Sequence, residues 1–161
     1  MSKNVIITGT SRGIGLELIK LFSNSGFNVL SLSRNKNIAE KLNLNNTSCL
    51  SFDITKEEDH LLVNKFISNN WNSVDILINN AGLLINKNFQ DTTLKDFNDV
   101  YNTNVFGVAR LIQVCLPFMK ENGQVVNISS IGGVQGSVKF PGLSAYSSSK
   151  GAVNILTELL A

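Results

Sequence analysis

Short apolar runs and amphipathic stretches alternate along the whole chain. The apolar runs are typical of buried strands and cover Val5 to Thr8, Asn28 to Ser33, Ser48 to Phe52, Val74 to Ile78 and Gly123 to Ile128. Apolar residues at helical spacing predict helices from near Ile14 to Ser25, from a Thr55 N-cap to about Asn70, from about Asp91 to Lys120, and onward from Ser144. Because strands that alternate with helices form parallel sheets covered on both faces, the pattern predicts a three-layer α/β domain.

The composition narrows the classes of protein to which the chain can belong. Its 161 residues suit a single domain over 1–161, and a core of reasonable size is expected because 43% of them are hydrophobic. The net charge is only +2, with 16% charged residues. This balance excludes a disordered chain and argues against a nucleic-acid binder that relies on bulk charge. Small neutral or anionic ligands fit better.

The cysteines and the amino terminus indicate the compartment. Cys49 and Cys115 lie far apart, without the Cys-x-x-Cys spacing of zinc sites. No metal site is therefore predicted, and both cysteines are expected to be small buried groups in a reducing compartment. The first predicted strand begins at Val5, which leaves no room for a signal peptide, and no apolar run is long enough to span a bilayer. We expect a cytoplasmic protein without a membrane partner.

A glycine-rich turn connects the first predicted strand to the first predicted helix. It reads Thr-Gly-Thr-Ser-Arg-Gly-Ile-Gly from Thr8 to Gly15. Gly9, Gly13 and Gly15 would let the backbone approach a bound group closely, and the positive end of the following helix would face that group. The expected ligand is an anion, above all a pyrophosphate. The alternative is an ordinary turn in which glycine only supplies a positive φ.

The spacing of these glycines differs from the Gly-x-Gly-x-x-Gly of the common dinucleotide-binding turn. It resembles the first motif of the short-chain dehydrogenases/reductases, Thr-Gly-x-x-x-Gly-Ile-Gly, at every fixed position. Asn79-Asn80-Ala81-Gly82 is similar to a second motif of that family, in which small residues lie against the cofactor and asparagine amides tie neighbouring strand ends together; the alternative is an ordinary turn. The resemblance covers the whole chain and implies a Rossmann-type doubly wound parallel sheet of order 3-2-1-4-5, with a ligand crevice between strands one and four.

The end of the second predicted strand indicates which dinucleotide is bound. Many dinucleotide sites place an acidic residue there to bind the ribose 2′-hydroxyl, but this strand ends in Leu32-Ser33-Arg34. Arg34, together with Arg12 in the glycine turn, would offer charge-assisted hydrogen bonds to a 2′-phosphate. In the resembling family, basic residues at these two places accompany NADP preference. NADP(H) is therefore preferred over NAD(H), unless both arginines are merely solvated loop residues.

Asp53, at the end of the third predicted strand, has two interpretations. It is either a turn residue near a helix start or the acceptor of the adenine amino group, the role that the resemblance implies and that we favour. The single histidine, His60, lies in the polar first turns of the next helix and is expected at the surface. The cofactor-binding residues implied by the resemblance are Gly9, Ser11, Arg12, Gly13, Ile14, Gly15, Arg34, Asp53, Ile54, Asn80, Ala81, Gly82, Tyr146 and Lys150.

Tyr146 and Lys150 are i, i+4 neighbours on one face of the last predicted helix. Carbonyl reduction leaves negative charge on oxygen, so an acid must supply a proton. Tyrosine, with a reference pKa of about 10, can do so only if its phenolate is stabilised, and a lysine ammonium one turn away provides that stabilisation. The resemblance adds Ser130, rather than Ser129, as the hydroxyl that orients the substrate oxygen, and Asn104 as a member of a water-linked proton relay.

These motifs imply an NADP(H)-dependent oxidoreductase that transfers a hydride between the nicotinamide and a carbonyl or secondary alcohol substrate. Members of the family are commonly longer, and the chain ends at Ala161 inside the helix that carries Tyr146. We therefore expect an amino-terminal fragment, truncated after the fifth strand and part of the following helix, in which the adenine and pyrophosphate half is intact. The competing hypotheses are a nucleotide-binding module without turnover and an assembly protein.

The predicted helix between Val100 and Met119 is apolar on more than one face. A helix that covers only a sheet needs a single apolar stripe. The surplus predicts a second partner surface, most simply another copy of the chain. The expected assembly is a homodimer or homotetramer formed through the helix 99–120 and the helix from 144.

Overall fold

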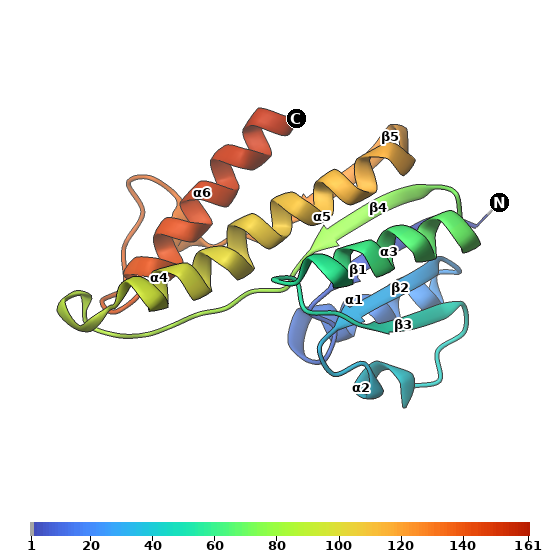
Figure 1. Ribbon diagram of the computed structural model, residues 1–161, viewed down its shortest axis with the longest axis horizontal. Helices are drawn as coiled ribbons and strands as arrows, with labels where there is room; N and C mark the ends of the chain where they lie inside the picture. The colour runs from blue at the N-terminus through green and yellow to red at the C-terminus, as the bar shows by residue number, and fades with distance from the viewer. Residues whose placement is uncertain (1) are drawn as a thin grey trace.

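The computed structural model describes residues 2–161. At its centre is one sheet of five parallel strands in the order β3-β2-β1-β4-β5 (Figure 1), which confirms the order implied by the sequence. The strands are β1 (Asn4–Thr8), β2 (Asn28–Ser33), β3 (Thr47–Ser51), β4 (Val74–Asn79) and β5 (Met119–Asn127). Because the order reverses between β1 and β4, a crevice is expected at the carboxyl ends of these strands.

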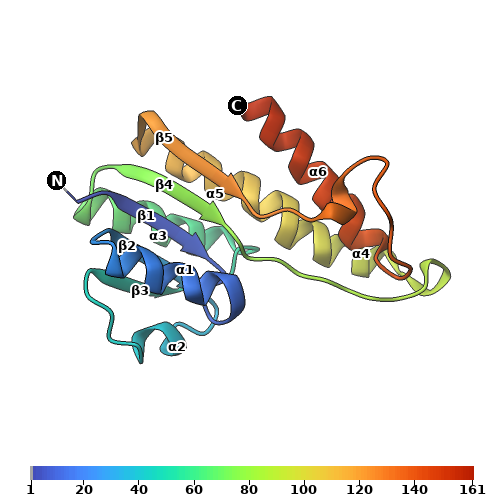
Figure 2. The same cartoon turned by 180° about the vertical axis from the view of Figure 1, so that it is seen from behind.

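Helices cover both faces of the sheet (Figures 1 and 2). One face carries α1 (Gly13–Asn24) and the short α2 (Asn37–Glu40), and the other carries α3 (Glu57–Asn70) and α5 (Gly107–Cys115). The helix α4 (Leu94–Tyr101) continues into α5 through a π-helical turn, η2 (Asn102–Phe106), and α6 (Ser144–Leu160) packs against α4 and η2. The three predicted layers are therefore present.

Each strand shares its side chains between two cores, because successive residues point to opposite faces. In β1, Ile6 belongs to the core beneath α3 and α5, whereas Val5 and Ile7 belong to the core beneath α1. All three side chains are fully buried, as is typical of a parallel sheet covered on both sides. This double packing gives the loops at the strand ends a rigid base.

The predicted helix over 91–120 begins later than expected. Its first residue, Asp91, is the last residue of a 3₁₀ turn, η1 (Phe89–Asp91), and α4 starts only at Leu94. The Thr93 hydroxyl accepts a hydrogen bond from the Asp96 amide, and the Asp96 carboxylate accepts one from the Thr93 amide. This capping box fixes the first turn of α4.

The same predicted helix also ends earlier than expected. The helix α5 stops at Cys115, Pro117 lies in a 3₁₀ turn, η3 (Leu116–Phe118), and β5 begins at Met119 rather than at Gly123. Proline lacks the amide hydrogen that a continuing α-helix needs, so the chain leaves the helix there. The added residues of β5 pair irregularly, with a register shift opposite the start of β4.

Lys87 and Thr93 both stabilise the charged form of Asp96. Lys87 Nζ lies 2.8 Å from each carboxylate oxygen, and the hydrogen bond from Lys87, with those from Thr93, lowers the pKa of Asp96 to about 2. A carboxylate whose folded pKa lies below its unfolded value stabilises the fold above the unfolded pKa. That stabilisation is lost as the pH falls toward the folded pKa.

We therefore expect the melting temperature of the wild-type chain to fall more steeply between about pH 4 and pH 2 than that of Asp96→Asn. Circular dichroism melts across this range provide the measurement. Asp99→Asn is the matched control, because Asp99 forms only an exposed pair with Lys95 and should leave the wild-type slope unchanged. Equal slopes for wild type and Asp96→Asn would contradict this explanation.

The two cysteines differ in burial. Cys115 is buried, and burial raises the pKa of its thiol to about 12, whereas Cys49 is only partly buried, contrary to expectation. No helix within residues 2–161 combines the length and apolar character that a membrane span requires. In the same range, no three His, Cys, Asp or Glu side chains gather as metal ligands would.

Candidate active site

A cleft of about 430 Å³ opens at the carboxyl ends of β1, β2 and β4. It brings together residues from the loops after β1, β2, β3 and β4. Of the residues assigned to the cofactor from the sequence, those that line the cleft are Gly9, Ser11, Arg12, Gly13, Ile14, Arg34, Asp53, Ile54, Asn80, Ala81 and Gly82. Gly15, Tyr146 and Lys150 do not line it.

Gly9 and Gly15 lie where the turn after β1 meets the loop after β4. Gly9 has a φ of +72°, which disfavours any residue with a side chain, and a Cβ there would lie 2.8 Å from Ala81 Cα. A Cβ on Gly15 would overlap the Gly9 carbonyl oxygen and lie 2.6 Å from Asn80 Nδ2. Gly15 therefore packs behind the turn rather than facing the cleft.

Hydrogen bonds tie the loop after β4 to the neighbouring strand ends. The Thr8 hydroxyl accepts from the amides of Asn80 and Ala81 at 3.0 and 2.9 Å, and Asn80 Nδ2 donates to the Thr8 carbonyl at 3.0 Å. Asn79 Nδ2 donates to Asn127 Oδ1 at 2.8 Å, which links β4 to β5. The predicted role of the asparagine amides as ties between strand ends is confirmed.

The amino-terminal end of α1 reaches the cleft through Arg12 and Gly13. Arg12 is the N-cap residue, its side chain does not cap the helix, and the first turn of α1 contains no acidic residue. The first amides of a helix lack intrahelical partners and carry partial positive charge. This end of the cleft fits the phosphates of a dinucleotide.

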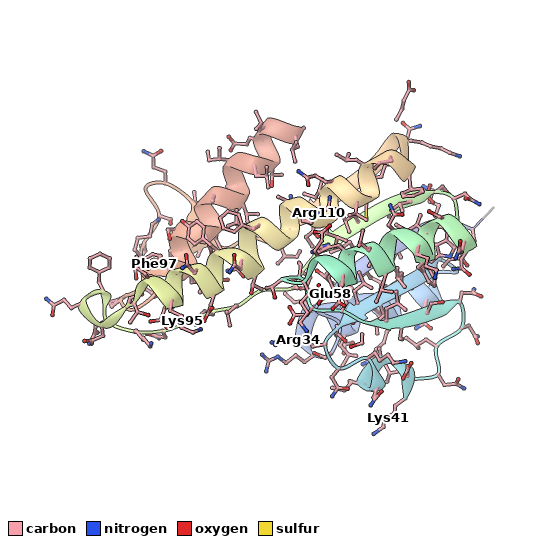
Figure 3. The ribbon with its side chains drawn as sticks, viewed as in Figure 1. Arg34, Lys41, Glu58, Lys95, Phe97 and Arg110 are labelled. Atoms are coloured by element: carbon pink, nitrogen blue, oxygen red, sulfur yellow. The ribbon has the colours of Figure 1, made fainter. Side chains whose placement is uncertain are left out.

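Two arginines stand at the rim of this cleft. Arg12 and Arg34 are exposed, and within residues 2–161 neither guanidinium takes part in an ion pair. Figure 3 shows Arg34 at the end of β2, well apart from Lys41 beside α2. Next to Arg34, the buried Ser33 hydroxyl has no hydrogen-bond partner among the described residues. This group of donors fits a phosphate on the adenine ribose.

Asp53 belongs to the turn after β3 and also lines the cleft. Its Oδ1 accepts from the Thr55 amide at 3.1 Å and from the Thr55 hydroxyl at 2.8 Å. The prediction that Thr55 caps α3 is therefore wrong, since α3 begins at Glu57 with Lys56 as its N-cap. Burial alone would raise the pKa of Asp53, but the Thr55 bonds and the nearby Arg34 and Lys56 lower it.

The expected surface position of His60 is also wrong. The side chain is only 2% exposed, its Nε2 lies 2.9 Å from the Ile54 carbonyl oxygen, and its ring meets Phe52 edge to face. The expectation relied on the polar residues that surround His60 in the sequence. His60 is spaced at helical intervals from Val63 and Ile67, and it shares with them the buried face of α3.

Asn104 lies in η2 and joins the loop after β4 to α6. Its Oδ1 accepts from the Leu83 amide at 2.8 Å, and its Nδ2 donates to the Leu83 carbonyl and to Ser149 Oγ, both at 2.9 Å. Both amide hydrogens are therefore in use. A water molecule bound to this side chain could only donate a hydrogen bond to it.

Lys150 is buried at the edge of the cleft, near the ring of Tyr146. Its Nζ donates to the Ile128 carbonyl at 2.7 Å and lies 5.8 Å from the centroid of the Tyr146 ring. A Cβ on Gly82, which lines the cleft, would lie 3.8 Å from this Nζ. Burial lowers the pKa of Lys150. The ammonium thus lies between a phenol and the nucleotide cleft.

Ser129 and Ser130, which follow β5, use their hydroxyls differently. Ser129 Oγ donates to the Lys150 carbonyl at 3.2 Å, so its hydrogen is directed to α6. Ser130 Oγ accepts from the Gly132 amide at 3.2 Å, within the 3₁₀ turn η4 (Ile131–Gly133), and keeps its hydrogen for another acceptor. This difference favours Ser130 as the hydroxyl that donates to a substrate oxygen.

Sequence reasoning missed several residues of the cleft, namely Leu32, Ser33, Asn35, Phe52, Leu83 and Thr103. They belong to no motif, but each stands within two residues of a position that the motifs identify. Five of them lie close to strand ends, where the walls of a crevice in such a sheet are expected, whereas Thr103 lies in η2 and adjoins Asn104.

Comparisons with known proteins agree with this architecture. The family model described as short chain dehydrogenase matches residues 3–161. An uncharacterized oxidoreductase of Staphylococcus saprophyticus is 34% identical over 166 residues, which cover 97% of this chain and 65% of that protein. The crystal structure of a short-chain dehydrogenase from Streptomyces avermitilis matches with a TM-score of 0.92 at 34% identity, covering 100% of this chain and 60% of that one.

A structure of ElxO with NADP bound matches with a TM-score of 0.89 at 34% identity, covering 100% of this chain and 67% of that one. The chain spans less than two thirds of the length of the Staphylococcus and Streptomyces proteins. Over this span it shares the fold of the Streptomyces protein, and the family model covers nearly every residue. The chain therefore belongs to the short-chain dehydrogenase/reductase family.

Proposed function

We propose that this chain is an NADP(H)-dependent oxidoreductase, or the cofactor-binding part of one, that transfers a hydride between the nicotinamide and a carbonyl or secondary alcohol. The observation that carries the proposal is the position of the buried Lys150 ammonium, between the Tyr146 ring and Gly82 at the cleft edge. Proton transfer coupled to hydride transfer needs a phenol with a stabilised conjugate base beside the cofactor. The relative ElxO, solved with NADP bound, supports the cofactor class.

The nicotinamide, when bound, supplies the hydride in reduction and accepts it in oxidation. As negative charge develops on the substrate oxygen, the Tyr146 hydroxyl donates its proton to that oxygen. The Lys150 ammonium stabilises the phenolate that remains, and Ser130 donates a hydrogen bond to the same substrate oxygen. Asn104 offers an acceptor to a water molecule through which the proton can be replaced. In alcohol oxidation the same groups act in the reverse direction.

Different residues of the cleft bind different parts of the dinucleotide. The glycine turn and the first amides of α1 bind the pyrophosphate. Asp53 accepts a hydrogen bond from the adenine amino group through Oδ2, since Oδ1 is already bonded to Thr55. Arg34 and Arg12 bind the 2′-phosphate, which distinguishes NADP(H) from NAD(H).

The test is a fluorescence titration of the purified chain with NADPH and with NADH, run for wild type and Arg34→Ala. Wild type is expected to bind NADPH more tightly than NADH. Arg34→Ala is expected to weaken NADPH binding by about tenfold or more, the value of a hydrogen bond between charged groups, and to leave NADH binding nearly unchanged.

The matched control is Lys41→Ala, which removes one positive charge near α2, outside the cleft (Figure 3). It is expected to leave both affinities unchanged, because the effect of Arg34 depends on direct contact. An equal loss for NADPH and NADH in Arg34→Ala would contradict the assignment of the 2′-phosphate to Arg34. Binding without turnover of any aldehyde or ketone would favour the nucleotide-binding module, and no binding at all would favour the assembly protein.

The helices also support an oligomer of this chain. Phe106 and Leu116, two of the apolar residues that predicted a partner surface, are 59% and 50% exposed. Ile155 and Leu159 on α6 are exposed as well. Large exposed apolar side chains on neighbouring helices are typical of surfaces between copies of a chain. We include in the proposal a homodimer or homotetramer through α4, α5 and α6.

A further inference from the structure

The cleft wall formed by Phe52, Asp53 and Ile54 is held in place from α3. Asp59 Oδ2 accepts a hydrogen bond from the Asp53 amide at 2.7 Å, and His60 Nε2 lies 2.9 Å from the Ile54 carbonyl oxygen. The two contacts fix the Asp53–Ile54 segment at both of its ends, through the Asp53 amide and the Ile54 carbonyl. Two consecutive residues of α3 therefore set the position of this wall.

The contact with Ile54 fixes the role of one nitrogen of the His60 ring. A carbonyl oxygen can only accept, so Nε2 carries a hydrogen and donates it. Nδ1 is buried and has no hydrogen-bond partner within residues 2–161. The ring also packs against Phe52, with the ring centroids 5.2 Å apart. His60 thus contacts two of the three wall residues.

Packing alone would not select a histidine at this position. His60 shares the inner face of α3 with Val63 and Ile67, which are fully buried. An apolar side chain would fill the same space without leaving a buried ring nitrogen unpaired, which is unfavourable. What the imidazole adds is its hydrogen bond to the Ile54 carbonyl, so its contribution lies at the cleft wall.

The first residue of α5, Gly107, also packs against Ile54. A Cβ on Gly107 would lie 2.5 Å from the Ile54 carbonyl oxygen and 2.7 Å from its Cγ1. The Ile54 carbonyl is therefore close to both α5 and the His60 ring. When the hydrogen bond from His60 is lost, the buried carbonyl must move to find another donor, and the neighbouring Asp53 moves with it.

We infer that His60 is a positioning residue of the cofactor site, which fixes the Ile54 carbonyl and thereby places the Asp53 carboxylate against the adenine base. The inference rests on the proposed function, because it assumes that the adenine lies at Asp53. His60 itself lines no part of the cleft and acts through the wall.

The experiment compares NADPH with its hypoxanthine analogue, in which a carbonyl replaces the adenine amino group. Wild type is expected to bind NADPH about tenfold more tightly than the analogue, because the hydrogen bond from the amino group to the Asp53 carboxylate is lost. In His60→Leu this ratio is expected to fall toward one, chiefly through weaker NADPH binding. A purely structural role would weaken the binding of both nucleotides alike.

Two further variants serve as controls. His60→Gln places an amide nitrogen near the position of Nε2 and is expected to restore the ratio. Ile67→Ala opens a cavity on the same helix face, about two turns farther along α3, and is expected to lower the melting temperature while keeping the ratio. Should His60→Leu fail to fold, His60→Asn replaces it with the same expected loss, because its shorter amide does not reach Ile54.

An unchanged ratio in His60→Leu or His60→Asn overturns the inference while the proposed function stands. A ratio lost equally in Ile67→Ala overturns it as well, because the effect would then follow from general destabilisation. If wild type binds neither nucleotide, the proposed function fails and the inference fails with it. The binding of wild type thus separates the two failures.

Discussion

Tyr146→Phe is expected to lower the rate of carbonyl reduction by about 10²- to 10⁴-fold, the contribution of a positioned general acid. Phenylalanine keeps the ring that lies 5.8 Å from Lys150 Nζ but has no proton to donate. NADPH binding should stay close to that of wild type, because Tyr146 does not line the nucleotide cleft. The measurement is the rate of NADPH oxidation with a panel of aldehydes and ketones, together with a separate NADPH titration.

Tyr101→Phe provides the matched control. Tyr101 is the other tyrosine of the chain; it lies at the end of α4, and its ring contacts Phe106. Loss of its hydroxyl should leave the rate unchanged. A Tyr146→Phe variant that reduces carbonyls at the wild-type rate would show that another group supplies the proton. A variant that loses NADPH binding would show that Tyr146 supports the cofactor rather than the chemistry.

The strand order and most of the cleft could be predicted because the informative residues stand at strand ends. The glycine turn follows β1, Arg34 follows β2, Asp53 follows β3 and the Asn79–Gly82 motif overlaps the end of β4. In a parallel sheet all these ends meet at one edge, so a linear order of motifs is enough to predict a common site.

His60 shows where the sequence becomes insufficient. Its neighbours Glu57, Glu58 and Asp59 are charged, so the local composition indicates solvent. Its burial depends on Phe52 and Ile54, which reach it only after the chain has turned from β3 into α3. The spacing of His60 from Val63 and Ile67 marks the buried face of α3, but the periodicity of the helix does not show which loop residues the side chain contacts.

Asn104 shows a second limit, because the residue was identified but its conformation was not. The apolar pattern predicts an uninterrupted helix around it, whereas the structure has a π turn in which the Gly107 amide donates to the Asn102 carbonyl. The wider turn accommodates the buried amide that bonds Leu83 and Ser149. A hydrophobic period of 3.6 residues cannot predict one inserted residue, since the apolar pattern resumes directly after it.

Lys150→Met is expected to lower the rate of carbonyl reduction by about 10²- to 10³-fold, the size of effect seen when one electrostatic stabiliser is removed from an active site. Methionine fills a similar space without the ammonium that donates to Ile128 and lies near Tyr146. The rate is measured as for Tyr146, and Lys95→Met, which removes an exposed lysine from α4 (Figure 3), should have no effect on it.

The melting temperature of Lys150→Met relative to wild type provides a second test, because the direction of its change with pH can be predicted. Burial lowers the pKa of Lys150 below its ordinary value of 10.5, so between the folded and ordinary pKa the folded chain binds fewer protons than the unfolded chain. Wild-type stability therefore gains from this lysine as the pH rises through that window, and Lys150→Met lacks the gain. The melting temperature of wild type relative to the variant should rise as the pH increases toward the ordinary lysine pKa of 10.5.

Lys95→Met should show no such rise, because Asp99 raises the pKa of Lys95 instead of lowering it. If the melting temperature of wild type relative to Lys150→Met does not change with pH, the ammonium is not desolvated in the folded chain. If Lys150→Met reduces carbonyls at the wild-type rate, stabilisation of the Tyr146 phenolate by Lys150 is not part of the mechanism. If Lys150→Met loses carbonyl reduction and the melting temperature of wild type relative to the variant rises with pH, the chain keeps a buried cation beside Tyr146 at a cost in stability. Such a cost is expected only if the cation serves the reaction.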